Sequence, residues 1–506
     1  MKLKQNLFVA AALIAGSASS FAAGILCDSS TPLKFASTCT PEVTYFIAGS
    51  SALGGSVEKI ISTYFDKTLM TPVKVVDNNT LFGSKVLAYY GMSIPSLTTT
   101  SKRMYIVYNS YNGSAAGVSN VLADSKLLTP VTVPESQVAL VGPYTLDKGK
   151  TYSEAKCSAN TSSTDAAPMV TCSSIAPRNV STQADVGLSD VKANELVSLY
   201  YDAIKGGAAK ASSVIANFNQ QKIAMQGFAV AVNDKLYNAM AVAQFGESCR
   251  NQYTSACQPN ITSAQYASLV TFEGSIKSAA ALVGDSTLTD KLIVARRDQL
   301  SGTQATSNLF FAGNTCNAVA PDVKTGKLGG ALTVLRTETA ATGYTPSAAN
   351  TLSSAQLALM SVKEFPQTGD LQSLLRTNTT DYVIGVVATD AADATSSAAK
   401  IKLLKLNGSS PDFAKGSTST TPALTGAALS TNIIDGSYPL QMAAYAVYPK
   451  TQTGDKAKIT TALLSDLSKY NSGKALPLGF FSGTTQVTTV SRYDGNNCSP
   501  LIQRAN

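Results

Sequence analysis

The sequence contains no histidine among its 506 residues. A chain without histidine cannot build a Ser-His-Asp or Cys-His nucleophile, and it lacks the imidazole ligands that most zinc sites use. Tryptophan is also absent, and only 14% of the residues are charged. Any enzyme made from this chain would have to use carboxylates, lysines, tyrosines or serines for its chemistry.

Charge of either sign is sparse along the chain. The 40 lysines and arginines stand against 32 acidic residues, so the formal net charge is +8 at pH 7. The basic residues form no run. A mild positive excess of this kind is compatible with a small anionic ligand, and it argues against nucleic acid as a partner.

Long apolar runs are missing except at the amino terminus. There, two lysines precede the apolar residues 7–15, and small residues follow as far as Ala22 and Ala23. This pattern predicts a secretory signal peptide over residues 1–23, cleaved near Ala22 and Ala23, and a mature protein that is soluble in the periplasm or secreted. The residues before Cys27 do not form a lipoprotein box, so we expect no lipid anchor.

The eight cysteines are an even number in a chain that we expect to be exported, and this favours disulfides. No two of them form a C-x-x-C pair, the spacing that would indicate a redox or zinc role. The sequence cannot choose among the many pairings. The most local arrangement pairs Cys27 with Cys39, Cys157 with Cys172, Cys249 with Cys257, and Cys316 with Cys498.

Apolar strand-like runs alternate with helical patterns, which is typical of α/β units around mostly parallel sheets. Runs such as KLIVA and YVIGVVA are apolar at nearly every position, as a sheet covered on both faces requires. Strands are predicted at residues 45–48, 104–109, 223–233, 292–295, 383–388 and 443–448, and helices around residues 57–64, 196–204 and 459–467. The length implies more than one domain.

Two polar stretches, residues 153–182 and 407–430, are rich in Ser, Thr and Ala. Their composition offers little apolar area to bury, so we expect surface loops or elaborations there.

Four short stretches combine a strand end with glycines and hydroxyl residues. They are GSS at 49–51, GSAAG at 113–117, DVGLSD at 185–190 and RRDQLSGT at 296–303. Glycine lets the backbone approach a ligand closely, and helix N-termini offer unpaired N–H groups to an anion. Together the stretches predict a cage for a small oxyanion, although any one of them alone is more often an ordinary helix cap. The first lacks the Lys-Ser/Thr of a nucleotide P-loop.

These stretches resemble the periplasmic phosphate-binding proteins of phosphate ABC transporters. ARRDQLSGTQATSNLF is similar to their R-R-x-D-G-S-G-T segment, NGSAAGV to their G-S-S-G-G-V loop, DVGLSD to D-F-G-A-S-D, and YFIAGSSA to their first strand and G-A-T-F corner. GFAVAVN and YPLQMAAYAVYPK resemble their two interdomain crossover strands. The order of all six segments is preserved over most of the mature chain.

The resemblance implies the two-lobed α/β fold of type II periplasmic binding proteins, with Ser/Thr-rich insertions. Residues 24–225 with 438–506 would form the first lobe, and residues 226–437 the second. Carried over position by position, it implies that the ligand contacts are Ser51, the backbone N–H of Ala52, Ser114, Asp190, Arg297, Ser301, Gly302 and Thr303.

The chemistry of these residue types agrees with that implication. Arg297 offers a planar fork of donors to two oxygens. A buried Asp190 can accept a hydrogen bond from a phosphate that still carries a proton, whereas it repels sulfate. The sequence departs from the family at Ala52-Leu53, where Phe-Pro is usual, and at Asp298, where the acid stands one place early. The loops are also farther apart than in the family.

Three other functions stay open at this point. The protein could be a phosphoesterase, although no carboxylate cluster has metal-ligand spacing. It could be a surface or structural protein that has lost its ligand, or a binder of another tetrahedral oxyanion such as sulfate or arsenate. Inorganic phosphate is the ligand we expect, with an ABC transporter membrane complex as the partner that the resemblance implies and no cofactor or metal.

Overall fold

The computed structural model describes residues 41–77, 86–110, 113–122, 132–133, 157–160, 169–173, 180–181, 183–193, 216–297, 301–313, 334–335, 352–365, 368–389, 401–414, 416, 418, 431–468, 480–481, 490–492 and 501–503. The predicted signal peptide, the predicted helix at 196–204, Asp298, and the pairs Cys27–Cys39 and Cys316–Cys498 lie outside these residues.

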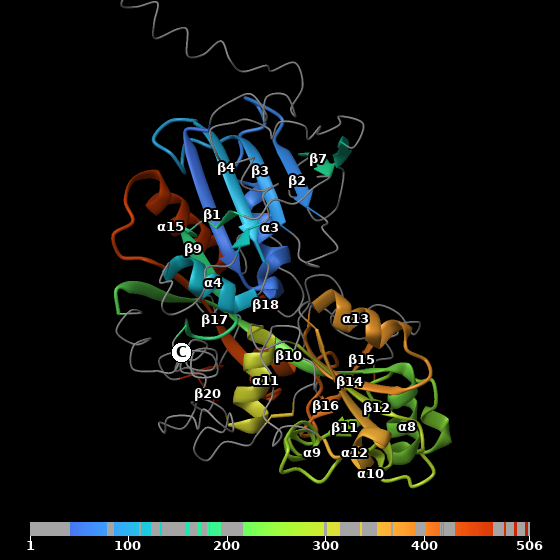
Figure 1. Ribbon diagram of the computed structural model, residues 1–506. Coiled ribbons are helices and arrows are strands. Elements are labelled where there is room, and N and C mark those ends of the chain that lie inside the picture. Colours follow the sequence, from blue (N-terminus) through green and yellow to red (C-terminus); the bar gives the residue numbers. More distant parts are fainter. Residues whose placement is uncertain are drawn as a thin grey trace, which may run out of the picture.

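The protein is an α/β molecule of two lobes (Figure 1). The first lobe contains strands β1 (Val43–Gly49), β2 (Val73–Asp77), β3 (Val86–Met92), β4 (Arg103–Asn109) and β9 (Val186–Ser189), the short helix η2 (Ser51–Leu53), and helices α3 (Gly54–Ser62), α4 (Gly113–Leu122) and α15 (Gly454–Ser468). Strands β6 (Cys157–Asn160) and β7 (Met169–Ser173) extend its sheet.

The second lobe contains strands β11 (Asn260–Ile261), β12 (Leu292–Arg297), β13 (Met360–Phe365), β14 (Tyr382–Ala388), β15 (Ile401–Leu403) and β16 (Lys405–Leu406). Its helices are α8 (Asp234–Phe245), η4 (Glu247–Cys249), α9 (Ser263–Val270), α10 (Ala279–Val283), α11 (Gly302–Ala312), α12 (Ser354–Leu359), α13 (Thr368–Thr377) and α14 (Thr431–Ile434). Further short strands are β5 (Thr132–Val133), which pairs with β8 (Val180–Ser181), β19 (Val490–Arg492), which pairs with β20 (Leu501–Gln503), and β18 (Phe480–Phe481).

One continuous sheet runs through both lobes, in the order β13-β12-β14-β10-β17-β9-β1-β4-β3-β2-β7-β6. Strand β1 is parallel to β4 and β9, and β12 is parallel to β13 and β14, so parallel strands form the centre of each lobe. Antiparallel strands flank them. The long β10 (Phe218–Asn233) and β17 (Gln441–Pro449) pair antiparallel at the junction of the lobes, where the sequence predicts the crossover strands.

Burial explains why the predicted strands and helices form. Every residue of β12 and β14 is buried, because helices or loops cover both faces of the sheet there. The apolar stripe of α3, including Val57 and Ile60, packs with that of α15, including Ile459 and Leu463, in the core of the first lobe. The two helices therefore join residues from opposite ends of the chain.

The two Ser/Thr-rich stretches are more structured than the sequence analysis expected. Part of the first forms β6 and β7, which add to the sheet edge through backbone hydrogen bonds that need no apolar side chains. Part of the second is buried in the second lobe, where Ser410, Asp412 and Phe413 are at most 5% exposed. The expectation of surface loops was wrong there, because neighbouring side chains donate hydrogen bonds to the Asp412 carboxylate and so allow it to be buried.

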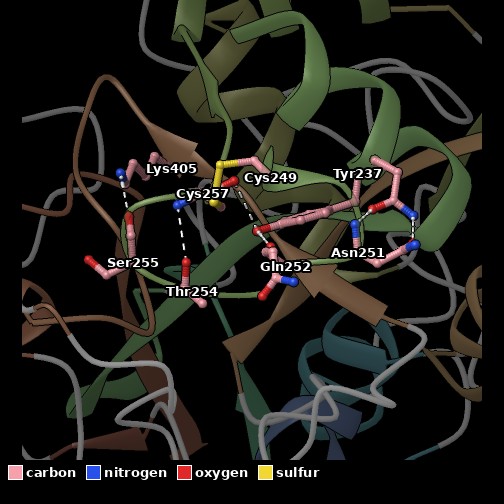
Figure 2. Close-up of a disulfide and its surroundings, with 9 residues drawn as sticks. Tyr237, Cys249, Asn251, Gln252, Thr254, Ser255, Cys257 and Lys405 are labelled. Carbon is pink, nitrogen blue, oxygen red and sulfur yellow. Dashed lines mark hydrogen bonds between the residues drawn. A yellow bond between two sulfur atoms is a disulfide. The ribbon is translucent and has the colours of Figure 1, made fainter. Parts of the chain in front are cut away.

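The structure contains the predicted disulfide between Cys249 and Cys257, whose Cα atoms are 5.2 Å apart. Figure 2 shows how it closes the loop that follows α8. The Tyr237 hydroxyl of α8 lies within hydrogen-bond distance of the carbonyl oxygens of Gln252 (3.2 Å) and Cys257 (3.3 Å), which fixes the loop against that helix. Cys157 stands directly opposite Cys172 in the β6/β7 register, and their pairing stays a prediction.

Candidate anion-binding site

Close backbone packing brings three of the predicted loops together. Helix α4 lies against the ends of β1 and β9, where Gly49 has a φ of +101°. A Cβ atom on Gly49 would lie 2.6 Å from the Cα of Gly117, and one on Gly117 would lie 2.9 Å from the Cα of Gly49. Gly187 likewise leaves no room for a Cβ beside the Gly117 carbonyl. The small residues therefore let α4 begin directly beside both strand ends.

Asp190 lies at the point where these loops meet. It follows β9 and is 2% exposed. The Ser50 hydroxyl donates a hydrogen bond to one carboxylate oxygen of Asp190, and the Asp190 backbone N–H donates to the Ser114 hydroxyl oxygen at 3.0 Å. The carboxylate is therefore held between the corner after β1 and the first turn of α4.

Burial raises the pKa of Asp190 from 3.8 to about 6. The Ser50 hydrogen bond, the positive charge of Arg297 and the Ser114 hydroxyl all act in the opposite direction, and they offset only part of the desolvation. Asp190 can consequently exchange a proton near neutral pH.

The N-terminus of α11 reaches this cluster from the second lobe. Ser301 caps the helix, its hydroxyl accepting from the backbone N–H of Gln304 at 3.4 Å. A Cβ atom on Gly302 would lie 2.5 Å from a carboxylate oxygen of Asp190 and would also collide with the Ser114 hydroxyl. Only glycine fits at this contact between the lobes. The partial positive charge of a helix N-terminus favours an anion there.

Arg297 is the last residue of β12 and is 3% exposed. Its Nε donates to the Phe365 carbonyl oxygen at 3.2 Å, and its Nη1 donates to the Thr368 hydroxyl. The Arg297 backbone N–H donates to the side-chain oxygen of Gln304 at 3.1 Å, which ties the strand end to α11. These bonds hold a buried guanidinium whose charge acts on Asp190.

The structure joins Ser114, Asp190 and Gly302 by direct contact, and Arg297 to Asp190 electrostatically. The other predicted residues lie at the same loops: Ala52 is in η2, Ser301 caps α11, and Thr303 is in its first turn, all buried. Ser51 begins η2, and its side chain lies outside the described part of the structure.

Sequence reasoning missed two residues of the cluster. It selected Ser51 from the GSS corner as a ligand contact, and it did not select the adjacent Ser50, whose hydroxyl donates to Asp190. It also overlooked Tyr108, whose buried hydroxyl donates to the Ser50 carbonyl oxygen at 2.6 Å and to that of Gly49 at 3.2 Å. Burial raises the pKa of Tyr108 well above 10.0, so the hydroxyl keeps its proton. Two adjacent serines carried no signal to choose between them, and Tyr108 resembled any core strand residue.

Within the described residues, the structure shows neither a metal-binding cluster nor a membrane-spanning helix. No group of three or more Cys, Asp or Glu side chains there could hold a metal ion. No helix in the same part of the chain is both long and apolar enough to cross a membrane.

Several solved structures match this chain over most of its length. A phosphate ABC transporter substrate-binding protein with bound phosphate from Clostridium perfringens is 11% identical; the match covers 86% of this chain and 99% of that one, with a TM-score of 0.37. An ABC-type phosphate transport receptor from Vibrio cholerae is 12% identical, covering 83% and 93%, with a TM-score of 0.31. A possible phosphate-binding protein from Planctomyces limnophilus is 9% identical, covering 84% and 86%, also at 0.31.

No protein-family model matches the sequence, and no curated protein sequence matches it. The assignment of a ligand therefore rests on the chemistry of the site itself.

Proposed function

We propose that this chain is an exported solute-binding protein that captures inorganic phosphate, as hydrogenphosphate, between its two lobes. The observation that carries the proposal is Asp190, a buried carboxyl group that lies between the hydroxyl groups of one lobe and the α11 N-terminus of the other. The ligand set would be Ser51, the Ala52 N–H, Ser114, Asp190, Arg297, Ser301, Gly302 and Thr303, with Ser50 supporting Asp190.

The donors and the single acceptor match phosphate better than sulfate. Arg297 and the helix N-terminus supply positive charge and N–H groups, which any tetrahedral oxyanion could use. Asp190 separates the candidates, because phosphate near neutral pH still carries a proton to donate and sulfate does not. A sulfate oxygen against the ionised carboxylate would meet like-charge repulsion, which costs several kcal/mol in a buried site.

This function requires no covalent chemistry. The protein would act as a binder rather than an enzyme, holding phosphate by closure of the lobes. Export by the predicted signal peptide would place it in the periplasm or outside the cell, and a membrane complex of the ABC transporter type would be its partner.

The test is calorimetric titration of phosphate, and then sulfate, into protein that has been unfolded, freed of carried-over anion and refolded with its disulfides intact. We expect micromolar or tighter phosphate binding, which corresponds to at least about 8 kcal/mol, and no heat from sulfate. The Asp190→Asn variant should narrow the difference between the two anions, because the amide can donate to sulfate. Arg297→Lys should weaken both anions by at least about tenfold, since lysine lacks the planar fork.

The matched control is Asp285→Asn, which changes an exposed carboxylate that accepts from Thr287. It should leave both titrations unchanged. Folded wild-type protein that gives no heat with either anion at several temperatures would contradict the proposal, and so would equal binding of phosphate and sulfate.

A further inference from the structure

A second polar pocket lies in the second lobe and shares no residue with the site between the lobes. Its volume is about 350 Å³, within the range of about 300 to 1,000 Å³ that small-molecule sites occupy. Its lining comes from three parts of the chain: from Ser255 in the disulfide loop, from Asn432 and Ser437 before β17, and from Lys405, Asn407, Gly408, Ser409, Ser410, Phe413, Ala414 and Gly416. An inorganic anion alone would fill only a small part of this volume.

The walls of the pocket are held by hydrogen bonds. Asn407 and Gly408 have φ values of 52° and 83°, the conformation of a tight hairpin turn. The Ser263 backbone N–H donates to the Asn407 side-chain oxygen at 2.8 Å, which fixes this turn to the start of α9. On another wall, the Asn432 amide donates to the carbonyl oxygens of Ser410 and Phe413, both at 2.9 Å. The pocket is therefore preformed.

A buried polar network adjoins the pocket through the lining residue Ser410. Asp412 is 0% exposed, and its carboxylate accepts from the Tyr253 hydroxyl, from the Gln258 amide at 2.7 Å and from the Ser410 hydroxyl at 3.0 Å. Three donors thus satisfy this carboxylate, which is not among the lining residues. None of the residues that line the pocket is acidic.

Lys405 is the charged residue in the pocket lining. Its ammonium donates to the Ser255 carbonyl oxygen at 2.9 Å, beside the Cys249–Cys257 disulfide (Figure 2). Partial burial lowers the pKa of Lys405, and the attraction of Asp412 offsets part of that effect. Since Asp412 already accepts from three other side chains, an incoming anion would compensate the lysine charge further.

We propose that this pocket is a second ligand site, which takes a small hydroxylated anion such as a hexuronate or a hexose phosphate. Lys405 would bind the anionic group. The hydroxyls of Ser255, Ser409 and Ser437, which line the pocket and are at least partly exposed, would bind the ring hydroxyls of the ligand. A carboxylate and a phosphate ester both present anionic oxygens that a lysine ammonium can bind. Titration with one ligand of each kind shows which of the two groups the pocket takes.

The test is titration calorimetry of the mature protein with glucuronate, glucose 6-phosphate and neutral glucose, with and without saturating inorganic phosphate. We expect at least one of the two anions to bind with a dissociation constant of about 1 mM or tighter, whether or not phosphate is present, and glucose to bind at least about tenfold more weakly. Binding of glucuronate alone identifies a carboxylate ligand, and binding of glucose 6-phosphate alone identifies a phosphate ester.

Three variants locate the site. Lys405→Met, which keeps the chain length and removes the charge, should weaken the binding at least tenfold. Ser409→Asp adds a negative charge on a partly exposed lining residue, where folding is not at risk, and should weaken binding similarly. Lys458→Met, an exposed lysine of α15 in the first lobe, is the matched control and should bind as the wild type does.

Several outcomes would overturn the proposal: no binding of either anion, glucose binding as tightly as the anions, or binding unchanged in both Lys405→Met and Ser409→Asp. The result does not depend on the phosphate proposal, because the variants lie outside the site between the lobes and each titration is also run without phosphate.

Discussion

At the scale of single residues, Asp190 and Arg297 illustrate how burial changes what a side chain does. On the surface, a carboxylate at Asp190 would stay ionised above pH 4 and select little. In the cluster it is desolvated, and Ser50 and Arg297 restore only part of the lost stabilisation. The motif DVGLSD was enough to identify the residue. Its burial and its bond to Ser50 depend on contacts that the motif does not encode.

The raised pKa of Asp190 predicts a pH dependence of stability. The folded protein binds this proton more tightly than the unfolded chain does, so ionisation of Asp190 lowers the free energy of unfolding as pH rises from about 4 through about 6. A difference of about two pKa units corresponds to about 3 kcal/mol. Anion-free Asp190→Asn, which cannot ionise, should therefore gain stability relative to wild type across this window.

Urea unfolding of both proteins at several pH values measures this gain. Asp285→Asn is the control, since hydrogen bonds from Thr287 lower the pKa of that exposed carboxylate and its removal should give no such gain. If the free energies of unfolding of wild type and Asp190→Asn differ by the same amount at every pH from 4 to 7, Asp190 does not titrate as described.

At the scale of elements, the packing of α4 on β1 and β9 decides where the first-lobe hydroxyls lie. Gly49, Gly117 and Gly187 contact one another through backbone atoms, which cannot move aside as a flexible side chain could. From the sequence alone, we expected these glycines to let the backbone approach a ligand closely. In the structure much of the room beside them is used by the helix itself, which begins beside the strand ends.

Gly117→Ala should therefore destabilise the protein by about 2 kcal/mol or more, because the added methyl group overlaps the backbone at Gly49 and Leu188. Inside a helix, the same change normally stabilises by up to about 1 kcal/mol. Gly369→Ala in α13 is the matched control, since its Cβ would meet no atom within 4 Å. The urea unfolding midpoints of the two variants measure these effects. If neither variant shifts the midpoint, Gly117 does not pack closely against Gly49 and Leu188.

At the scale of the whole molecule, the contact of Gly302 with Ser114 and Asp190 links the lobes at the site, and strands β10 and β17 link them at the sheet. The lobes can close fully only if no side chain stands between α11 and Asp190. Binding of an anion and approach of the lobes should consequently depend on the same glycine.

We predict that Gly302→Ala separates the lobes. The added methyl group would collide with Ser114 and Asp190, so anion affinity should fall at least tenfold. Small-angle X-ray scattering should show a smaller radius of gyration for wild type when phosphate is added, and no such decrease for Gly302→Ala. Gly369→Ala should behave as wild type, and compaction of Gly302→Ala by phosphate would refute the prediction.

The sequence by itself determined the α/β class, six central strands, helices α3 and α15 and the helix starts at Gly113 and Gly302. These follow from local patterns: apolar periodicity decides burial, and glycine or serine at a strand end decides where a helix can begin. Strands β2, β3 and β13 were missed, although they span five, seven and six residues; charged or glycine residues interrupt the apolar pattern of each one.

Only the tertiary structure decided which groups meet. Ser50 donates to a carboxylate 140 residues away, and a stretch that the sequence predicts as a polar loop supplies the buried Asp412 and lining residues of a second pocket. The physical reason is that strand register and backbone packing between distant segments set these distances. Register and packing depend on the whole folded chain, whereas the residue types at each loop can be read from the sequence alone.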